Sequence, residues 1–142
     1  MPNSSHQNLF QISILVKEYD EAIHHYCNVL GFTLLEDTDL GNGKRWVRVA
    51  PSNQGCSLLL ARAKNEKERQ AIGNQSGGRV FLFLHTNDFW NYYDSLMKNN
   101  INFLEKPRKE SYGTVVVFQD LYGNKWDLIE PKEEKPNPPN SE

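Results

Sequence analysis

Histidine and cysteine are the residues that most often bind metals or act as nucleophiles, and here the histidines are poorly spaced for metal binding. His24 and His25 are adjacent on a predicted helix, where successive side chains diverge by about 100° and cannot share a metal ion. His6 falls in a polar N-terminal segment. His85 closes a predicted strand, where a lone histidine is more often a rim residue than a ligand. The spacing therefore indicates no histidine metal centre.

The two cysteines do not suggest redox or nucleophilic chemistry. They form no Cys-x-x-Cys motif and are too few for a disulfide framework. Cys27 falls on the apolar stripe of a predicted helix, which favours a buried structural thiol. Cys56 opens a predicted strand and has no basic neighbour in sequence that would stabilise a thiolate. The candidate chemistry therefore rests on polar residues of the strands.

The first half of the chain predicts the element order βαβββ. Residues Leu9–Val16 are rich in β-branched and aromatic side chains and read as a strand. Asp20 can cap a helix whose apolar positions recur at helical spacing, and Gly31 is a natural stop for it. Three further strands are predicted at Phe32–Leu40, Arg45–Ala50 and Cys56–Ala61, the first two joined by an Asn-Gly turn.

The second half repeats this order. A strand at Val80–His85 precedes a helix that Asn87 or Asp88 can cap, and Asn99-Asn100 stands where Gly31 stood. Strands are then predicted at Ile101–Glu105, Gly113–Gln119 and Lys125–Glu130. When the two halves are aligned so that Leu84 matches Val16, Arg79 matches Gln11. Self-similarity over about fifty residues indicates a duplicated unit. One such unit exposes a sheet face, so two must pack or pair.

These elements predict one domain over residues 9–131, with a first module at 9–62, a linker at 63–78 and a second module at 79–131. The linker is charged and then Gly-rich, which predicts a short exposed helix running into a flexible stretch. Residues 132–142 contain no aliphatic side chain, and we expect a disordered tail.

Bulk composition excludes several classes of protein. A net charge of −2 and a pI near 6.1 give no overall attraction for nucleic acid or anionic membranes. No apolar run approaches the roughly 20 residues that span a bilayer, and the N-terminus lacks a signal-peptide pattern. We therefore expect a cytoplasmic protein that binds neither partner.

Two stretches of the chain resemble the vicinal-oxygen-chelate superfamily, which includes glyoxalases, bleomycin-resistance proteins and extradiol dioxygenases. Residues 14–22 (ILVKEYDEA), with Tyr26 and Leu30-Gly31-Phe32, resemble the first strand and helix of that family. Residues 118–129 (FQDLYGNKWDLI) resemble its closing hairpin. The resemblance implies an α+β fold: two βαβββ modules forming a cupped, partly open mixed β-sheet barrel with flanking helices. It also implies a ligand site on the concave face, and commonly a homodimer.

In metal-using members of the family, four equivalent strand positions supply histidine and carboxylate ligands to a divalent ion. Here the corresponding positions are Gln11 on the first strand, Ser57 or Leu58 on the fourth, Arg79 on the fifth and Asp127 on the last. A guanidinium cannot donate a lone pair to a metal and repels one. One carboxylate alone does not hold a catalytic metal, so we expect no cofactor and no metal ligands.

The alternation of side chains along strands predicts which residues face the cup. Apolar residues such as Val47 and Val49 should face the helices. The residues expected inside are Gln11, Ser13, Trp46, Arg48, Arg79, Phe81, Phe83, His85, Lys125 and Asp127. This lining suits a flat aromatic or anionic molecule. Alternatively, Arg79 and Asp127 form a buried ion pair that plugs a vestigial site.

Three functions follow from this lining. The first is a metal-independent protein that binds a small molecule, as bleomycin-resistance proteins do. The second is a lyase, isomerase or dioxygenase of the same superfamily, lactoylglutathione-lyase-like, with Asp127 as the catalytic base. A nearby Arg79 would lower the pKa of that base, which weakens the enzyme reading. The third is a structural or regulatory protein that keeps only the fold.

Overall fold

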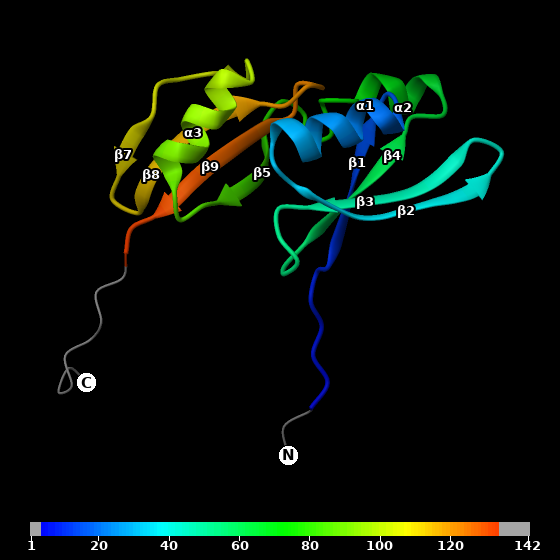
Figure 1. The fold of residues 1–142 in the computed structure, drawn as a ribbon, viewed down its shortest axis with the longest axis horizontal. Helices are drawn as coiled ribbons and strands as arrows, with labels where there is room; N and C mark the ends of the chain where they lie inside the picture. Colours follow the sequence, from blue (N-terminus) through cyan, green and yellow to red (C-terminus); the bar gives the residue numbers. More distant parts are fainter. Residues whose placement is uncertain (1–3, 134–142) are drawn as a thin grey trace. The chain divides into compact units, whose positions relative to one another are not determined.

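The computed structural model describes residues 4–133, which divide into two compact units. The first unit ends at Gly77 and also includes the turn Leu121–Gly123, while the second spans Gly78–Asp120 and continues from Asn124. Each unit contains a mixed sheet and its own helix (Figure 1). Of the predicted tail, residues 134–142 lie outside the described part of the chain.

The sheet of the first unit has the strand order β1-β4-β3-β2. Its strands are β1 (Gln11–Val16), β2 (Thr33–Gly41), β3 (Lys44–Ala50) and β4 (Ser57–Arg62). β1 runs parallel to β4, and the other neighbours are antiparallel. The four predicted strands are therefore present. β1 begins two residues later than expected because its partner β4 starts at Ser57, whose amide donates to the carbonyl of Phe10.

The first helix is less regular than its sequence suggests. α1 (Tyr19–Ile23) continues as a π-helical turn, η1 (His24–Val29), and Gly31 follows with φ +77° as the left-handed stop. Asp20 is not its cap: Glu18 takes that position without a side-chain hydrogen bond, and Asp20 lies in the first turn. A carboxylate there still interacts favourably with the helix dipole.

One face of the first sheet packs against α1 and η1 (Figure 1). The side chains buried there alternate along the strands as predicted: Ile14, Val16, Val47, Val49, Leu58 and Leu60. Ala22 and Tyr26 cover them from the helix, and neither is exposed. The other face carries no helix of its own unit.

The start of α1 is fastened to the sheet by two arginines. The Tyr19 ring lies close to the guanidinium groups of Arg45 and Arg62, whose carbons are 5.2 and 5.0 Å from the ring centroid. Arg45 also bonds Asp37 on β2 at 2.7 Å and Asp20 at 2.8 Å. Stacking and charge therefore fix the helix over β3 and β4.

The sheet of the second unit repeats this path in the order β5-β9-β8-β6, with β7 also paired to β8. Its strands are β5 (Val80–His85), β6 (Asn102–Phe103), β7 (Arg108–Glu110), β8 (Gly113–Gln119) and β9 (Lys125–Pro131). β5 runs parallel to β9. The fold is therefore α+β with two mixed sheets, and the described residues form no closed barrel.

The strand expected at Ile101–Glu105 is shorter, because only β6 forms there, and β7 is an additional short strand that was not expected. Pro107 between them has no amide hydrogen for the ladder. The side chain of Glu105 fills the gap, because its Oε2 accepts from the backbone amide of Val117 at 3.0 Å. The interruption is thus bridged by a carboxylate.

Helix α3 (Phe89–Lys98) lies over one face of the second sheet (Figure 1). Aromatic rings make the contact between them. The rings in contact are those of Phe89, Tyr93, Phe103, Phe118 and Trp126. Asp88 is the N-cap, and Asn100 follows the helix with φ +63°, the left-handed conformation expected for this position.

In chain order, α2 (Glu66–Ala71) follows β4 and is a short helix with no buried residue, capped by the Asn65 side chain. Gln75 follows it and covers part of the free edge of β1: its amide accepts from Leu15 N at 2.8 Å and donates to Ser13 O at 3.2 Å. Among the described residues, no helix is long and apolar enough to cross a membrane.

The β8–β9 hairpin is held by a buried carboxylate. Asp120 accepts hydrogen bonds from the backbone amide of Asn124 at 3.0 Å, from its side-chain amide at 3.0 Å, and from Trp126 Nε1 at 2.9 Å. Both Asp120 and Asn124 are buried. Residues of the hairpin motif seen in the sequence thus form a hydrogen-bond network that fixes the start of β9.

Replacing Asp120 with alanine should lower the free energy of unfolding by about 2–4 kcal/mol, because buried donors on Asn124 and Trp126 lose their acceptor. Urea unfolding followed by tryptophan fluorescence measures this change. Asp94→Ala, at an exposed position of α3, is the control and should change stability by less than about 0.5 kcal/mol. Equal effects of the two variants would contradict the network's role.

Candidate functional site

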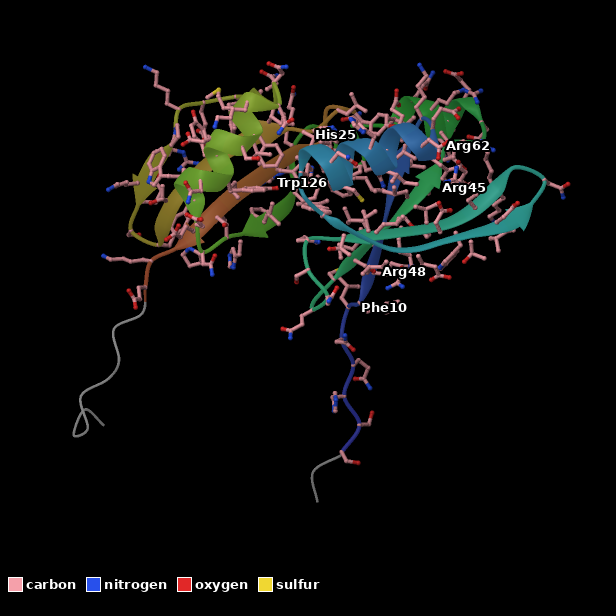
Figure 2. All side chains as sticks on the ribbon, in the orientation of Figure 1. Phe10, His25, Arg45, Arg48, Arg62 and Trp126 are labelled. Carbon is pink, nitrogen blue, oxygen red and sulfur yellow. The ribbon has the colours of Figure 1, made fainter. Side chains whose placement is uncertain are left out.

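The helix-free face of the first sheet carries a row of side chains across four strands. Ser13 pairs with Leu59, Leu59 with Arg48, and Arg48 with Glu36, so the four side chains lie side by side. Figure 2 shows Arg48 on the opposite side of β3 from Arg45 and Arg62, which lie on the helix side. The alternation along β3 thus separates an arginine of the open face from the arginines that hold α1.

Arg48 is the centre of a polar cluster on this face. Its Nε donates to Gln11 Oε1 at 2.8 Å, and its Nη2 donates to Ser57 Oγ at 3.3 Å. Glu36 Oε1 lies 3.5 Å from Nη1. Ser57 is buried and Arg48 half-buried. The guanidinium is therefore held in one orientation and keeps further N–H donors for a ligand.

This cluster does not fit the divalent metal that the family resemblance implies. Gln11 and Ser57 are direct partners in the β1–β4 pairing, so Ser57 rather than Leu58 is the fourth-strand residue beside Gln11. Both side-chain oxygens accept from Arg48, and a fixed guanidinium beside them repels a second cation. Within residues 4–133, no three His, Cys, Asp or Glu side chains gather as metal ligands.

On the second sheet, Asp127 lies in a row between Phe83 of β5 and Val117 of β8. Its neighbours in the chain, Trp126 and Leu128, are buried, so Asp127 occupies the helix-free face. Phe83 is 65% exposed beside it. An aromatic ring and a carboxyl group thus lie next to each other on this face.

Arg79, the predicted partner of Asp127, is exposed and precedes β5. A bulge between Val80 and Leu82 shifts the register, so Val80 pairs with Lys125 and Phe83 with Asp127. The alternation from Phe83 to His85 therefore does not extend back to Arg79. The charged groups that act on Asp127 are instead Arg108 and Glu105.

Arg108 and Glu105 form an ion pair at the β6–β7 interruption. Arg108 Nε donates to Glu105 Oε1 at 3.0 Å, and Arg108 Nη1 bonds Glu110. Burial raises the pKa of Asp127 above its ordinary value, while Arg108 lowers it and Glu105 raises it. Desolvation is the largest of these effects, so the environment of Asp127 disfavours its charged form.

The other predicted residues are divided between the two sheets. Trp46 is half-buried on β3, and Ser13 is exposed on β1 with its carbonyl bonded to Gln75. Phe81 is half-buried at the bulge of β5, and His85 is exposed at its end, paired with Ile129. The structure thus brings Gln11 and Arg48 together, and Phe83 and Asp127.

Sequence reasoning missed Glu36, Glu105 and Arg108. Glu36 lies in a β2 segment with a register shift, which hides its alternation. Glu105 and Arg108 flank Pro107, and the spacing Glu-x-x-Arg beside a proline was the available signal. His25 belongs to the structure rather than to a site: it is buried in the first unit and its Nε2 accepts from the amide of Leu121 at 2.9 Å.

A separate hollow lies at the end of the second sheet. Lysines and glutamates make up most of its lining, and none of the predicted site residues lines it. The lining residues are Lys109, Glu110, Gly113, Thr114, Glu130, Pro131, Lys132 and Glu133. Mixed, exposed charges of this kind are more typical of a solvated surface than of a ligand pocket.

Comparison with known proteins places this arrangement in a family. A protein of Shewanella frigidimarina, itself uncharacterized, is 49% identical over 132 residues, which are 92% of this chain and 98% of that protein. The crystal structure of UcmS2 is similar with a TM-score of 0.76 and 26% identity, covering 89% of this chain and 99% of that one. TnmS3, described as an antibiotic binding protein from Streptomyces sp. CB03234, is similar with a TM-score of 0.75 and 25% identity, covering 92% of this chain and all of that one.

The sequence model of one family matches residues 8–128, and therefore both sheets with the faces described above. The predicted resemblance is thereby confirmed, and the similar solved structures include members of the same family. This chain belongs to the glyoxalase/bleomycin resistance protein/dioxygenase superfamily, the vicinal-oxygen-chelate fold.

Proposed function

We propose that this protein binds a small organic molecule on the helix-free faces of its sheets, without the divalent metal used by metal-dependent members of its superfamily. The observation that carries the proposal is the Arg48 cluster. Gln11 and Ser57, at positions where metal-using members place ligands, instead orient a guanidinium. A permanent cation with free N–H groups suits an anionic or carbonyl group on the ligand.

The similarity to TnmS3 supports binding rather than catalysis. That protein is described as antibiotic binding, and its likeness extends over 92% of this chain. Trp46 lies on the same helix-free face of the first sheet as Arg48, which suits a ligand with a flat aromatic part. We infer that the ligand combines an aromatic ring with polar groups.

The enzyme reading rests on one observation, the raised pKa of Asp127. A carboxylate whose charged form is disfavoured by burial is a stronger base than an exposed one. Such a group would suit proton transfer in a lyase or isomerase. Turnover that Asp127→Asn abolishes and Arg48→Met leaves intact would favour this reading over binding.

We also propose that the protein is a cytoplasmic homodimer organised as one domain over residues 9–131. Sheet edges support pairing: Gln75 covers only the part of the β1 edge near Leu15. Leu9 and Phe10, just before that strand, are exposed apolar residues that a partner would cover.

Arg48→Met should weaken the binding of an aromatic anion, anilinonaphthalene sulfonate, at least about tenfold, because the charge-assisted hydrogen bonds are lost. Fluorescence titration of the folded protein measures the affinity, with circular dichroism to confirm the fold. Arg69→Met, which removes an exposed arginine of α2, is the matched control and should bind like the wild type. Equal affinities of all three proteins would contradict the Arg48 site.

The purified protein should hold well under one equivalent of divalent metal per chain. The reason is the fixed guanidinium of Arg48 beside Gln11 and Ser57. Elemental analysis after dialysis against nickel or zinc salts measures the content. One tightly held ion per chain would contradict the metal-free proposal, unless substitution of Gln11 and Asp127 leaves the ion in place.

Asp127→Asn should raise the stability of the folded protein at pH 7. Folding raises the pKa of this carboxyl above its value in the unfolded chain, near 3.8. Its contribution to the free energy of unfolding is therefore complete when the pH is below 3.8, and it is lost as the pH rises. At neutral pH the ionised wild type bears the cost of desolvation and the amide does not. Thermal melts should therefore differ at pH 7 and converge near pH 3.

Asp94→Asn removes a charge from an exposed position of α3 and should not show this pH dependence. A wild type more stable than Asp127→Asn at pH 7 would mean that the carboxylate has a stabilising partner.

A further inference from the structure

Two side-chain oxygens in residues 4–133 are shielded from solvent and accept no hydrogen bond from the chain: Asn124 Oδ1 and Asp127 Oδ1. Asn124 lies inside the β8–β9 hairpin, where its other atoms bond Asp120. Asp127 lies on the helix-free face of its sheet and carries a negative charge when ionised. A shielded anionic oxygen without a donor is costly, and such sites gather where function requires them.

The cations near Asp127 are already engaged. Arg108 donates to Glu105 at 3.0 Å and bonds Glu110, so two carboxylates share its charge. Lys125, two residues away on the same strand face, donates from Nζ to the carbonyl of Gly78 at 2.8 Å. Glu105, in turn, is fixed by the amide of Val117. The local charge around Asp127 is therefore negative, and neither of these cations donates a hydrogen bond to its carboxylate.

The neighbours of Asp127 in its row define what else the ligand contacts. Phe83 is 65% exposed and lies directly beside it, and Val117 lies on its other side. An exposed phenyl ring offers a face for stacking to a ligand ring and for a nearby cation. An aromatic ring that carries an ammonium group suits this face, because the ring can stack on Phe83 while the cation lies near the Asp127 carboxylate.

We propose that the Phe83–Asp127 face is a subsite for an aromatic ammonium group, with the ring on Phe83 and the cation beside the Asp127 carboxylate. This inference rests on the proposed function and names the class of ligand for the helix-free face of the second sheet. Glu105 and Arg108 are positioning residues: they fix each other beside the site and so keep the guanidinium from closing onto Asp127.

The test compares three naphthalene probes of nearly equal size: naphthylmethylamine as the cation, naphthylmethanol as the neutral analogue and naphthoate as the anion. Isothermal titration calorimetry at pH 7 measures each affinity for the full chain. In the wild type the amine should bind at least about tenfold more tightly than the alcohol. Asp127→Asn should reduce that ratio to near one, while Asp94→Asn, with the same charge change, should preserve it.

Phe83→Leu should weaken the amine and the alcohol by similar factors, because both lose the stacking surface. Trp90→Leu is its control, since Trp90 is 53% exposed and lies on α3 rather than on the helix-free face. An amine-to-alcohol ratio near one in the wild type, or a high ratio that survives Asp127→Asn, overturns the subsite.

The two proposals fail differently. Naphthoate binding that depends on Arg48, without any preference for the amine over the alcohol, overturns the subsite and leaves the proposed function standing. Binding of none of the three probes overturns both. Asp127→Asn is expected to remain folded, because it removes a charge that burial disfavours, and thermal melts verify this before titration.

Discussion

In each sheet the first strand runs parallel to the last, and the rest of the structure depends on this pairing. A parallel neighbour cannot be reached by a hairpin, so the chain crosses over through a helix, which covers one face of the sheet. The other face is left without a helix. The same pairing sets Gln11 beside Ser57 and Phe83 beside Asp127, so residues nearly fifty positions apart become neighbours on the open face.

On the two open faces, charge is handled in opposite ways. The guanidinium of Arg48 is hydrogen-bonded by Gln11 and Ser57 and paired with Glu36. These partners compensate its charge and fix its orientation. Asp127 has a shielded oxygen without a donor, and its strongest influence is desolvation. A matched charge preorganises a site, whereas an unmatched one makes the site selective for whatever can match it.

Much of the fold could be predicted from the sequence because its signals are local. The alternation of Val47 and Val49 with Arg48 gave the two faces of β3, and the left-handed residues Gly31 and Asn100 ended the helices where expected. The π-helical turn of η1 was not predicted, because the apolar spacing of this segment is that of an ordinary helix. Non-local geometry also decided the bulge in β5, which takes Arg79 out of the row that holds Asp127.

The sequence predicts which types of residue lie at the candidate site, but not which of their charged groups meet. Residue types on alternate positions identified Gln11, Arg48 and Asp127, because a polar residue in an otherwise apolar strand is conspicuous. Which charges meet depends on register, and one extra residue at a bulge exchanges every partner beyond it. Arg108 is the cation that acts on Asp127, and its partner Glu105 accepts a hydrogen bond from the backbone amide of Val117. In such a duplicated fold, irregularities of the strands rather than their regular parts decide the chemistry of each open face.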